Sequence, residues 1–141
     1  MEKNTFVTAI SIAVIIIAFS SSLNTGTSAL TVENVFLESY IVEFAYVGLE
    51  KQIDEKGVVK VTVKWLFHNI AGRTINATIN AEFYNRNDVL LYNASKEIWL
   101  LPANYTEQLL LPANMISFYG QNAAEVEYVI IHVNELQDSS N

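Results

Sequence analysis

The sequence contains no cysteine. Disulfide bonds, thiolate metal sites, iron–sulfur clusters and cysteine nucleophiles are therefore excluded. Basic residues are also few, since 8 Lys and Arg stand against 15 Asp and Glu, which gives a formal net charge of -7. An acidic chain repels the phosphate backbone, so we expect no nucleic-acid partner.

Glycine is scarce, with 5 residues in the whole chain. No Gly-x-Ser-x-Gly elbow and no glycine loop of the phosphate-binding type occurs, so the sequence offers no support for a serine hydrolase or a nucleotide-binding enzyme. Charged residues make up 16% and hydrophobic residues 51%, a balance that predicts a folded chain. A length of 141 residues suits one core.

The N-terminal segment is apolar. Residues 6–19 carry no charge, and this length fits the hydrophobic region of a secretory signal or a short membrane anchor. Small residues at Thr27 and Ala29 fit signal-peptidase cleavage after Ala29, so a cleaved signal and a retained anchor are equally compatible with the pattern. A third alternative, a pilin-type assembly helix, lacks the usual basic residues before the apolar run. All three predict an extracellular or cell-surface protein.

We therefore divide the chain into a hydrophobic N-terminal helix at 1–29, a folded domain at 30–136 and a polar tail at 137–141. The segment 1–29 would act as signal peptide, membrane anchor or assembly helix. It would contact the membrane if it is retained.

The rest of the sequence alternates as strands do. Val59 to Phe67 and Ile75 to Phe83 each place apolar residues on one face and polar residues on the other, which predicts two half-buried strands. The turn-like residues 69–73 between them predict a β-hairpin. Val126 to Val133 is apolar on both faces and predicts a central strand.

The remaining segments are shorter or less regular. Thr31 to Tyr46 fits a helical face or a bent strand, and we favour the strand, followed by a charged loop at Gly48 to Gly57. Further strands are predicted at 89–92, 97–101 and 108–111. The total of about seven strands predicts an all-β, immunoglobulin-like two-sheet sandwich.

Residues 59–104 carry a family resemblance in the turn at 69–72, the aromatic pair Phe83 and Tyr84, and the polar turn at Asn87 and Asp88. On these features the chain resembles immunoglobulin-like sandwiches of the FxLYD and late-embryogenesis-abundant type. It is also similar to the globular heads of archaeal pilin and surface-filament proteins. The family's usual Asp-Gly and Pro-Gly turns are replaced by Asn87-Asp88 and Pro102-Ala103. The resemblance implies a fold, and such folds host many functions.

Three Asn-x-Ser/Thr acceptors for N-glycosylation occur, at Asn76, Asn93 and Asn104. Asn76 falls on the polar face of its predicted strand, and the other two fall in or near predicted turns. We expect all three to carry glycans, in keeping with an extracellular surface.

Catalytic and metal-binding patterns are weak. His68 and His132 are the only histidines, and they lie too far apart in the sequence to form a His-x-x-x-His pair. Paired carboxylates occur at Asp54 and Glu55, and at Glu125 and Glu127, without a calcium-loop pattern. We expect no cofactor, no metal and no enzymatic activity.

These observations predict a non-enzymatic extracellular structural protein. The preferred hypothesis is a self-assembling subunit of a surface filament, thread or surface layer, whose partners are copies of itself. The alternative is a monomeric binding module, secreted or tethered to the membrane, that recognises a ligand, a sugar or a partner protein.

Overall fold

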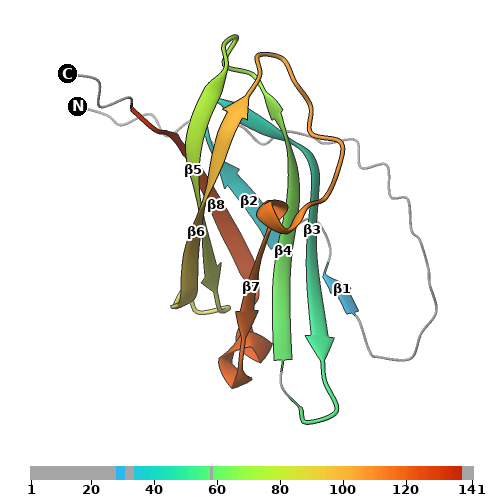
Figure 1. Ribbon diagram of the computed structural model, residues 1–141. Helices are drawn as coiled ribbons and strands as arrows, with labels where there is room; N and C mark the ends of the chain where they lie inside the picture. Colours follow the sequence, from blue (N-terminus) through green and yellow to red (C-terminus); the bar gives the residue numbers. More distant parts are fainter. Residues whose placement is uncertain (1–27, 31–33, 58, 138–141) are drawn as a thin grey trace, which may run out of the picture.

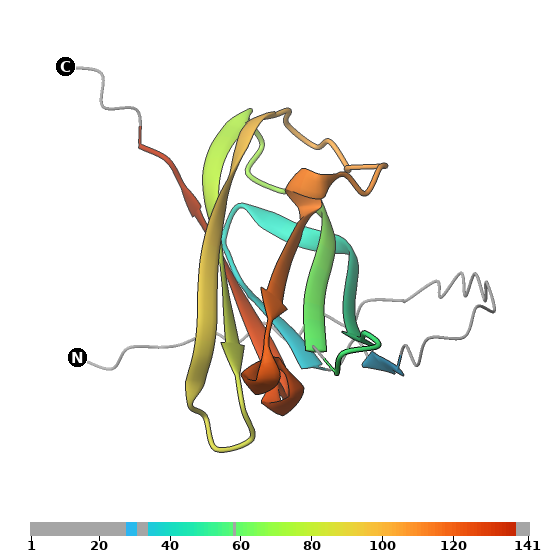
Figure 2. The same ribbon diagram turned by 60° about the horizontal axis from the view of Figure 1, so that its bottom comes forward.

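The computed structural model describes residues 28–30, 34–57 and 59–137 (Figure 1). This part of the chain forms two four-stranded sheets, with strand orders β1-β3-β4-β7 and β2-β8-β5-β6. The sheets lie against each other as two layers (Figure 2). The strands are β1 (Ser28–Leu30), β2 (Val35–Glu38), β3 (Val42–Ile53), β4 (Val59–Asn69), β5 (Ile75–Tyr84), β6 (Leu90–Leu101), β7 (Met115–Tyr119) and β8 (Tyr128–Glu135), with two 3-10 turns, η2 (Pro112–Asn114) and η3 (Gln121–Glu125).

The all-β prediction is confirmed, with eight strands where about seven were expected. The core lies between the two sheets, because buried apolar residues alternate with more exposed residues along β4, β5 and β8. Trp65 and Phe67 of β4 and Phe83 of β5 are fully buried there. Phe67 stacks on Phe44 and on Trp65, with ring centroids 5.8 and 5.9 Å apart.

The predicted β-hairpin between β4 and β5 is wrong. β4 pairs with β3 and β7, whereas β5 pairs with β6 and β8, so the two strands belong to different sheets. Alternation of apolar and polar residues shows which face of a strand is buried, but it does not determine which strand pairs with it. The connection at residues 70–74 crosses from one layer to the other.

Three predicted boundaries also change. The strands expected at 89–92 and 97–101 form one continuous strand, β6, and the charged loop expected at Gly48 to Gly57 is largely strand, since β3 extends to Ile53. The strand expected at 108–111 is a loop. The three successive leucines in this segment lack the alternation of apolar and polar residues that marks a half-buried strand, and each of them is exposed.

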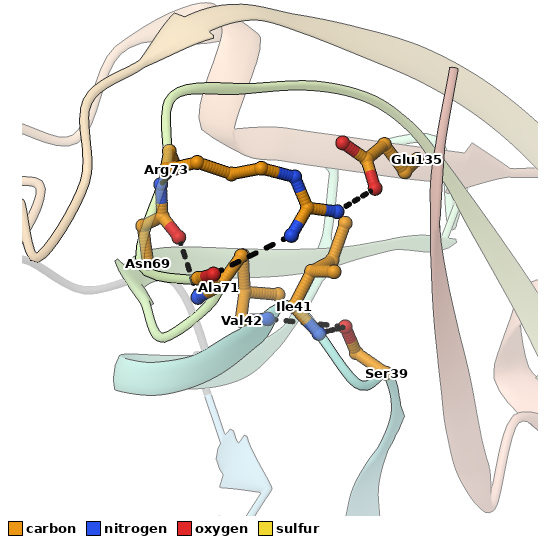
Figure 3. A network of polar contacts seen from close by, with 7 residues as sticks. All are labelled: Ser39, Ile41, Val42, Asn69, Ala71, Arg73 and Glu135. Carbon is orange, nitrogen blue, oxygen red and sulfur yellow. Dashed lines mark hydrogen bonds and ion pairs between the residues drawn. The ribbon is translucent and has the colours of Figure 1, made fainter. Parts of the chain in front are cut away.

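The last strand is interior, as expected, because β8 lies between β2 and β5. β2 and β8 run parallel, with Val35 in register with Val129. The segment expected to be one bent strand at 31–46 divides instead into β2 and the start of β3, and residues 31–33 lie outside the described residues. Ser39 marks the change of sheet, because its Oγ accepts hydrogen bonds from the backbone N–H groups of Ile41 and Val42 (Figure 3).

The predictions for the N-terminus fall almost wholly outside the described residues. This applies to the hydrophobic helix, to its cleavage or retention, and to the tail at 138–141. Within the ranges that the structure describes, no helix has the length and apolar character needed to cross a membrane.

Candidate functional site

An apolar surface lies where β6 ends and the following loop begins. It consists of Trp99 and Leu100 on β6 and of Leu109, Leu110 and Leu111 in the loop, and we call these five residues the apolar rim. Each of them exposes between 41% and 71% of its surface. Exposed apolar side chains are common singly, but a group of large ones on one side of a soluble domain marks an interaction surface.

One hydrogen bond beside the rim links β6 to the loop. The Lys96 ammonium on β6 donates to the backbone carbonyl of Pro112, which directly follows Leu111. The loop therefore returns alongside β6 before it enters β7. The rim follows one open side of the sandwich.

Leu100 holds an unusual backbone conformation. Its φ is 54°, in the left-handed region that side chains other than glycine, asparagine and aspartate rarely adopt. The pairing of β5 with β6 is irregular between Ile75 and Ala77, and the Asn76 Oδ1 accepts the Leu100 N–H there at 2.7 Å. Asn76 thus fixes a bulge at which an exposed leucine is held under strain.

Asn69 holds the base of the loop. Its side chain is fully buried, and its Nδ2 donates to the carbonyls of Arg73, Leu101 and Pro102 at 2.8 to 2.9 Å. Its Oδ1 accepts the Ala71 N–H at 2.8 Å. Figure 3 shows Asn69 beside the Arg73 carbonyl, and shows the Arg73 guanidinium reaching Glu135 on β8. One amide therefore joins the β4–β5 crossing to the end of β6.

The loop then pairs with the end of β4. The Tyr105 carbonyl accepts the Asn69 N–H, and the Glu107 N–H donates to the Phe67 carbonyl, both at 2.9 Å. The Glu107 carboxylate turns inward as well, because its Oε2 accepts from the Phe67 N–H and from the Asn114 Nδ2. Glu107 is the only charged residue between Ile98 and Met115, and its carboxylate is engaged by these two hydrogen bonds.

The outer face of the β2-β8-β5-β6 sheet is the second candidate. His132 on β8 lies between two carboxylates, with Nδ1 2.9 Å from Glu38 and Nε2 3.0 Å from Glu82. A neutral imidazole has one N–H and can donate to only one of them, whereas the protonated ring donates to both. The network joins three strands, β2, β8 and β5.

Aromatic residues extend this network. Tyr84 donates to Glu82 at 2.7 Å and stacks on Tyr128, whose ring meets the edge of Phe36. The Tyr84 hydrogen bond and the contact with His132 lower the pKa of Glu82 despite its partial burial. The same hydrogen bond raises the pKa of Tyr84 to about 12. Both pKa shifts arise because this hydrogen bond stabilises the state in which the Glu82 carboxylate is ionised and the Tyr84 phenol is neutral.

The other candidate residues do not meet in one place. His68 on β4 contacts Thr106 through Nδ1 at 2.6 Å, and it lies in the other sheet from His132. Asp88 accepts from the Tyr128 hydroxyl at 2.8 Å. Among the described residues, no group of three or more His, Asp or Glu side chains is placed to hold a metal ion.

The three predicted glycosylation sites have different surroundings. Asn76 is half-buried and uses its Oδ1 in the bulge, whereas Asn93 is exposed on β6 in register with Glu82. Asn104 is exposed at a φ of 58°, in a turn closed by the Tyr105 N–H and the Pro102 carbonyl. Glycosylation of all three stays a prediction, and the structure leaves Asn93 and Asn104 more open than Asn76.

The sequence reasoning missed the rim and Asn69. One signal was available for the rim, because the run Leu109 to Leu111 before a proline fits neither a half-buried strand nor a polar turn. Asn69 gave no such signal, since an asparagine before a glycine-containing turn is ordinary turn chemistry.

Comparison with known proteins adds one similarity. No family model matches the sequence, and no curated protein matches it. The fold is similar to the crystal structure of Campylobacter jejuni cj0090, with a TM-score of 0.37 and 11% sequence identity, over 73% of this chain and 98% of that one. A similarity at this level carries no argument about function and does not test the resemblance to the FxLYD type.

Proposed function

We propose that this chain is a non-enzymatic immunoglobulin-like β-sandwich that works outside the cytoplasm as a self-assembling subunit of a surface filament or surface layer. The observation that carries the proposal is the apolar rim. Five large side chains are exposed in the two segments of the rim, and one of them, Leu100, is held in a strained conformation. Several large apolar side chains exposed near one another favour an interaction surface.

The charge pattern favours a second copy as the partner. A net charge of -7 makes identical chains repel each other. The rim is the exception, because residues 98–115 include a single charge, Glu107, and its carboxylate is hydrogen-bonded inward. Two copies that meet rim to rim remove apolar surface from water, and the ammonium beside the rim, that of Lys96, is bonded to the Pro112 carbonyl of its own chain.

The location outside the cytoplasm rests on the sequence together with the exposed acceptors. The apolar run at 6–19 predicts export, and Asn93 and Asn104 are exposed sequons on a cysteine-free domain.

The alternative is a monomeric binding module, and the outer face of the β2-β8-β5-β6 sheet favours it. Tyr84, Tyr128 and Phe36 form an aromatic group beside the carboxylates of Glu38 and Glu82. Aromatic rings beside hydrogen-bonding groups are a common way to hold a sugar or a peptide. This alternative predicts that the protein is a monomer and that substitutions in the rim change neither its monomeric state nor its ligand binding.

The test compares assembly of the wild-type chain with two variants, each purified from the cell surface in a mild detergent that covers the N-terminal apolar run. Light scattering gives the mass of the particle, and intact-mass spectrometry reports cleavage and added hexose. Leu109→Lys should dissociate the particle without changing its circular dichroism. Ile53→Lys, which alters an aliphatic residue 50% exposed outside the rim, should leave assembly unchanged.

A wild-type chain that stays monomeric at high concentration would refute the proposal and favour the binding module. Equal assembly of the wild type and Leu109→Lys would refute the role of the rim. Detection of hexose at Asn93 or Asn104 would support export, while its absence would show that neither asparagine is glycosylated.

A further inference from the structure

β6 is an open sheet edge. This strand of 12 residues pairs with β5 on one side, and no other strand of the described chain pairs with it on the other side. It runs along one margin of the molecule (Figures 1 and 2). The N–H and C=O groups of such an edge form a template for another strand.

The register with β5 assigns each β6 residue to a face. Asn93, Ser95 and Glu97 are in register with polar residues of β5, so they share the outer face. Ala94, Lys96 and Ile98 are in register with buried residues, Ala81, Ile79 and Ala77, and share the inner face. A strand added to this edge must match face to face, because directly opposite residues project on the same side of a sheet.

We propose that β6 of a second copy pairs antiparallel with this edge, about a two-fold axis at Ser95, so that the two sheets join into one. The proposal rests on the self-assembly proposed above and adds a second contact to it. A two-fold axis makes the interface closed and self-complementary, so this joint alone gives a dimer, and contact between dimers is left to the loop leucines of the rim, Leu109 to Leu111. The β6 edges of both copies are then covered.

Charge and polarity together select the position of the axis. An axis at Lys96 or at Glu97 sets two like charges directly opposite each other, which destabilises the pair. An axis at Ala94 or at Ile98 avoids this but sets Glu97 opposite the apolar Leu91 or Trp99. An axis at Ser95 sets Glu97 opposite Asn93 of the second copy and Lys96 opposite Ala94. No like charges then meet along the strand.

The ends of the strand also match in this register. Leu100 falls opposite Leu90 of the second copy, and these two leucines are 70% and 44% exposed in the single chain. Pairing covers both of them at each end of the joint. Because Leu100 lies in the bulge, the contact between these leucines is one of side chains beside the regular ladder.

Lys96 is the feature that opposes edge pairing, because an inward-pointing lysine commonly protects an edge strand. Its ammonium is already bonded to the Pro112 carbonyl of its own chain. Pairing about Ser95 leaves that bond in place, since only the small side chain of Ala94 stands opposite. The lysine therefore disfavours registers centred on itself and tolerates this one.

Because the chain has no cysteine, an introduced cysteine is its only thiol, and a disulfide cross-link can form only at that position. Full-length Ser95→Cys should form a disulfide with itself under mild oxidation and shift from the monomer mass to twice that mass, because the two Ser95 residues face each other at the axis. The matched control is Asn134→Cys, an exposed residue of the interior strand β8, which should remain monomeric. A mixture of Asn93→Cys with Glu97→Cys should give the mixed dimer in preference to either self-dimer.

Light scattering on the same samples separates the two proposals. If the chain assembles but Ser95→Cys cross-links no better than Asn134→Cys, then pairing through β6 is wrong and self-assembly stands. If the chain does not assemble, both proposals fail. Cross-linking of Ser95→Cys without the preferred Asn93–Glu97 mixed dimer would overturn the register.

Discussion

Replacement of Asn69 by alanine should destabilise the fold strongly, although the residue lies at the end of a strand and touches no candidate site. Its carboxamide satisfies three carbonyl oxygens and one N–H. Nδ2 has two hydrogens, so two of the three carbonyls share one of them. Alanine removes every one of these bonds while the backbone groups remain.

The size of the effect follows from which groups water can reach. Arg73 and Pro102 are exposed, so water can replace the amide at their carbonyls. Leu101 is only 4% exposed, and its carbonyl would lose its partner, as would the half-buried Ala71 N–H. Each unsatisfied buried group costs about 1–3 kcal/mol, so these two groups together lower the free energy of unfolding by about 3 kcal/mol. For a domain of this size that lowers the melting temperature by about 15 °C.

Urea unfolding followed by tryptophan fluorescence measures this loss, because Trp65 is buried and reports on the core. Asn122→Ala, at an exposed position of η3, is the control and should change stability little. Asn69→Asp should be worse than Asn69→Ala at neutral pH, because a carboxylate would face three carbonyl oxygens. A cost for Asn69→Ala within about 1 kcal/mol of the control would refute the reasoning.

Further predictions concern strain and pH. Leu100→Gly should raise the free energy of unfolding by about 1 kcal/mol, since glycine adopts a φ of 54° without strain, and should weaken self-association in light scattering. Because the pKa of Glu82 is lowered from 4.5, its ionised form stabilises the fold above that value, and the contribution is lost as pH falls below it. The unfolding free energies of the wild type and Glu82→Gln should therefore converge in acid. Because the pKa of Tyr84 is raised from 10 to about 12, stability should fall between those pH values, and Tyr84→Phe should remove the last tyrosine to ionise in an absorbance titration.

The sequence predicted the strands of the core well and their neighbours poorly. The alternation in β4 and β5 identified the buried faces, because period two is a local property of the chain. Sheet membership depends on contacts that are remote in sequence, such as the bond from Asn69 to the Leu101 carbonyl, and no local pattern encodes it. The hairpin prediction failed for that reason.

In the candidate sites, too, local motifs were visible in the sequence, whereas contacts between remote residues were not. Asn76, Asn93 and Asn104 were found from a three-residue motif, but the motif could not show that Asn76 holds the bulge at Leu100. The contacts of His132 with Glu38 and Glu82 join residues far apart in the chain and became visible only in the fold. The run of three loop leucines showed that this segment lacks the alternation of a half-buried strand, but their exposure became visible only in the structure.

The parallel pairing of β2 with β8 has a consequence for the order of folding. Val35 is in register with Val129, a separation of 94 residues (129 minus 35), and β8 is the strand that joins β2 to the rest of its sheet. Contacts so remote in sequence form slowly, and this one cannot form until the C-terminal strand has been made. In a chain that crosses a membrane from its N-terminus, the second sheet would therefore close only after Tyr128 to Glu135 had reached the far side.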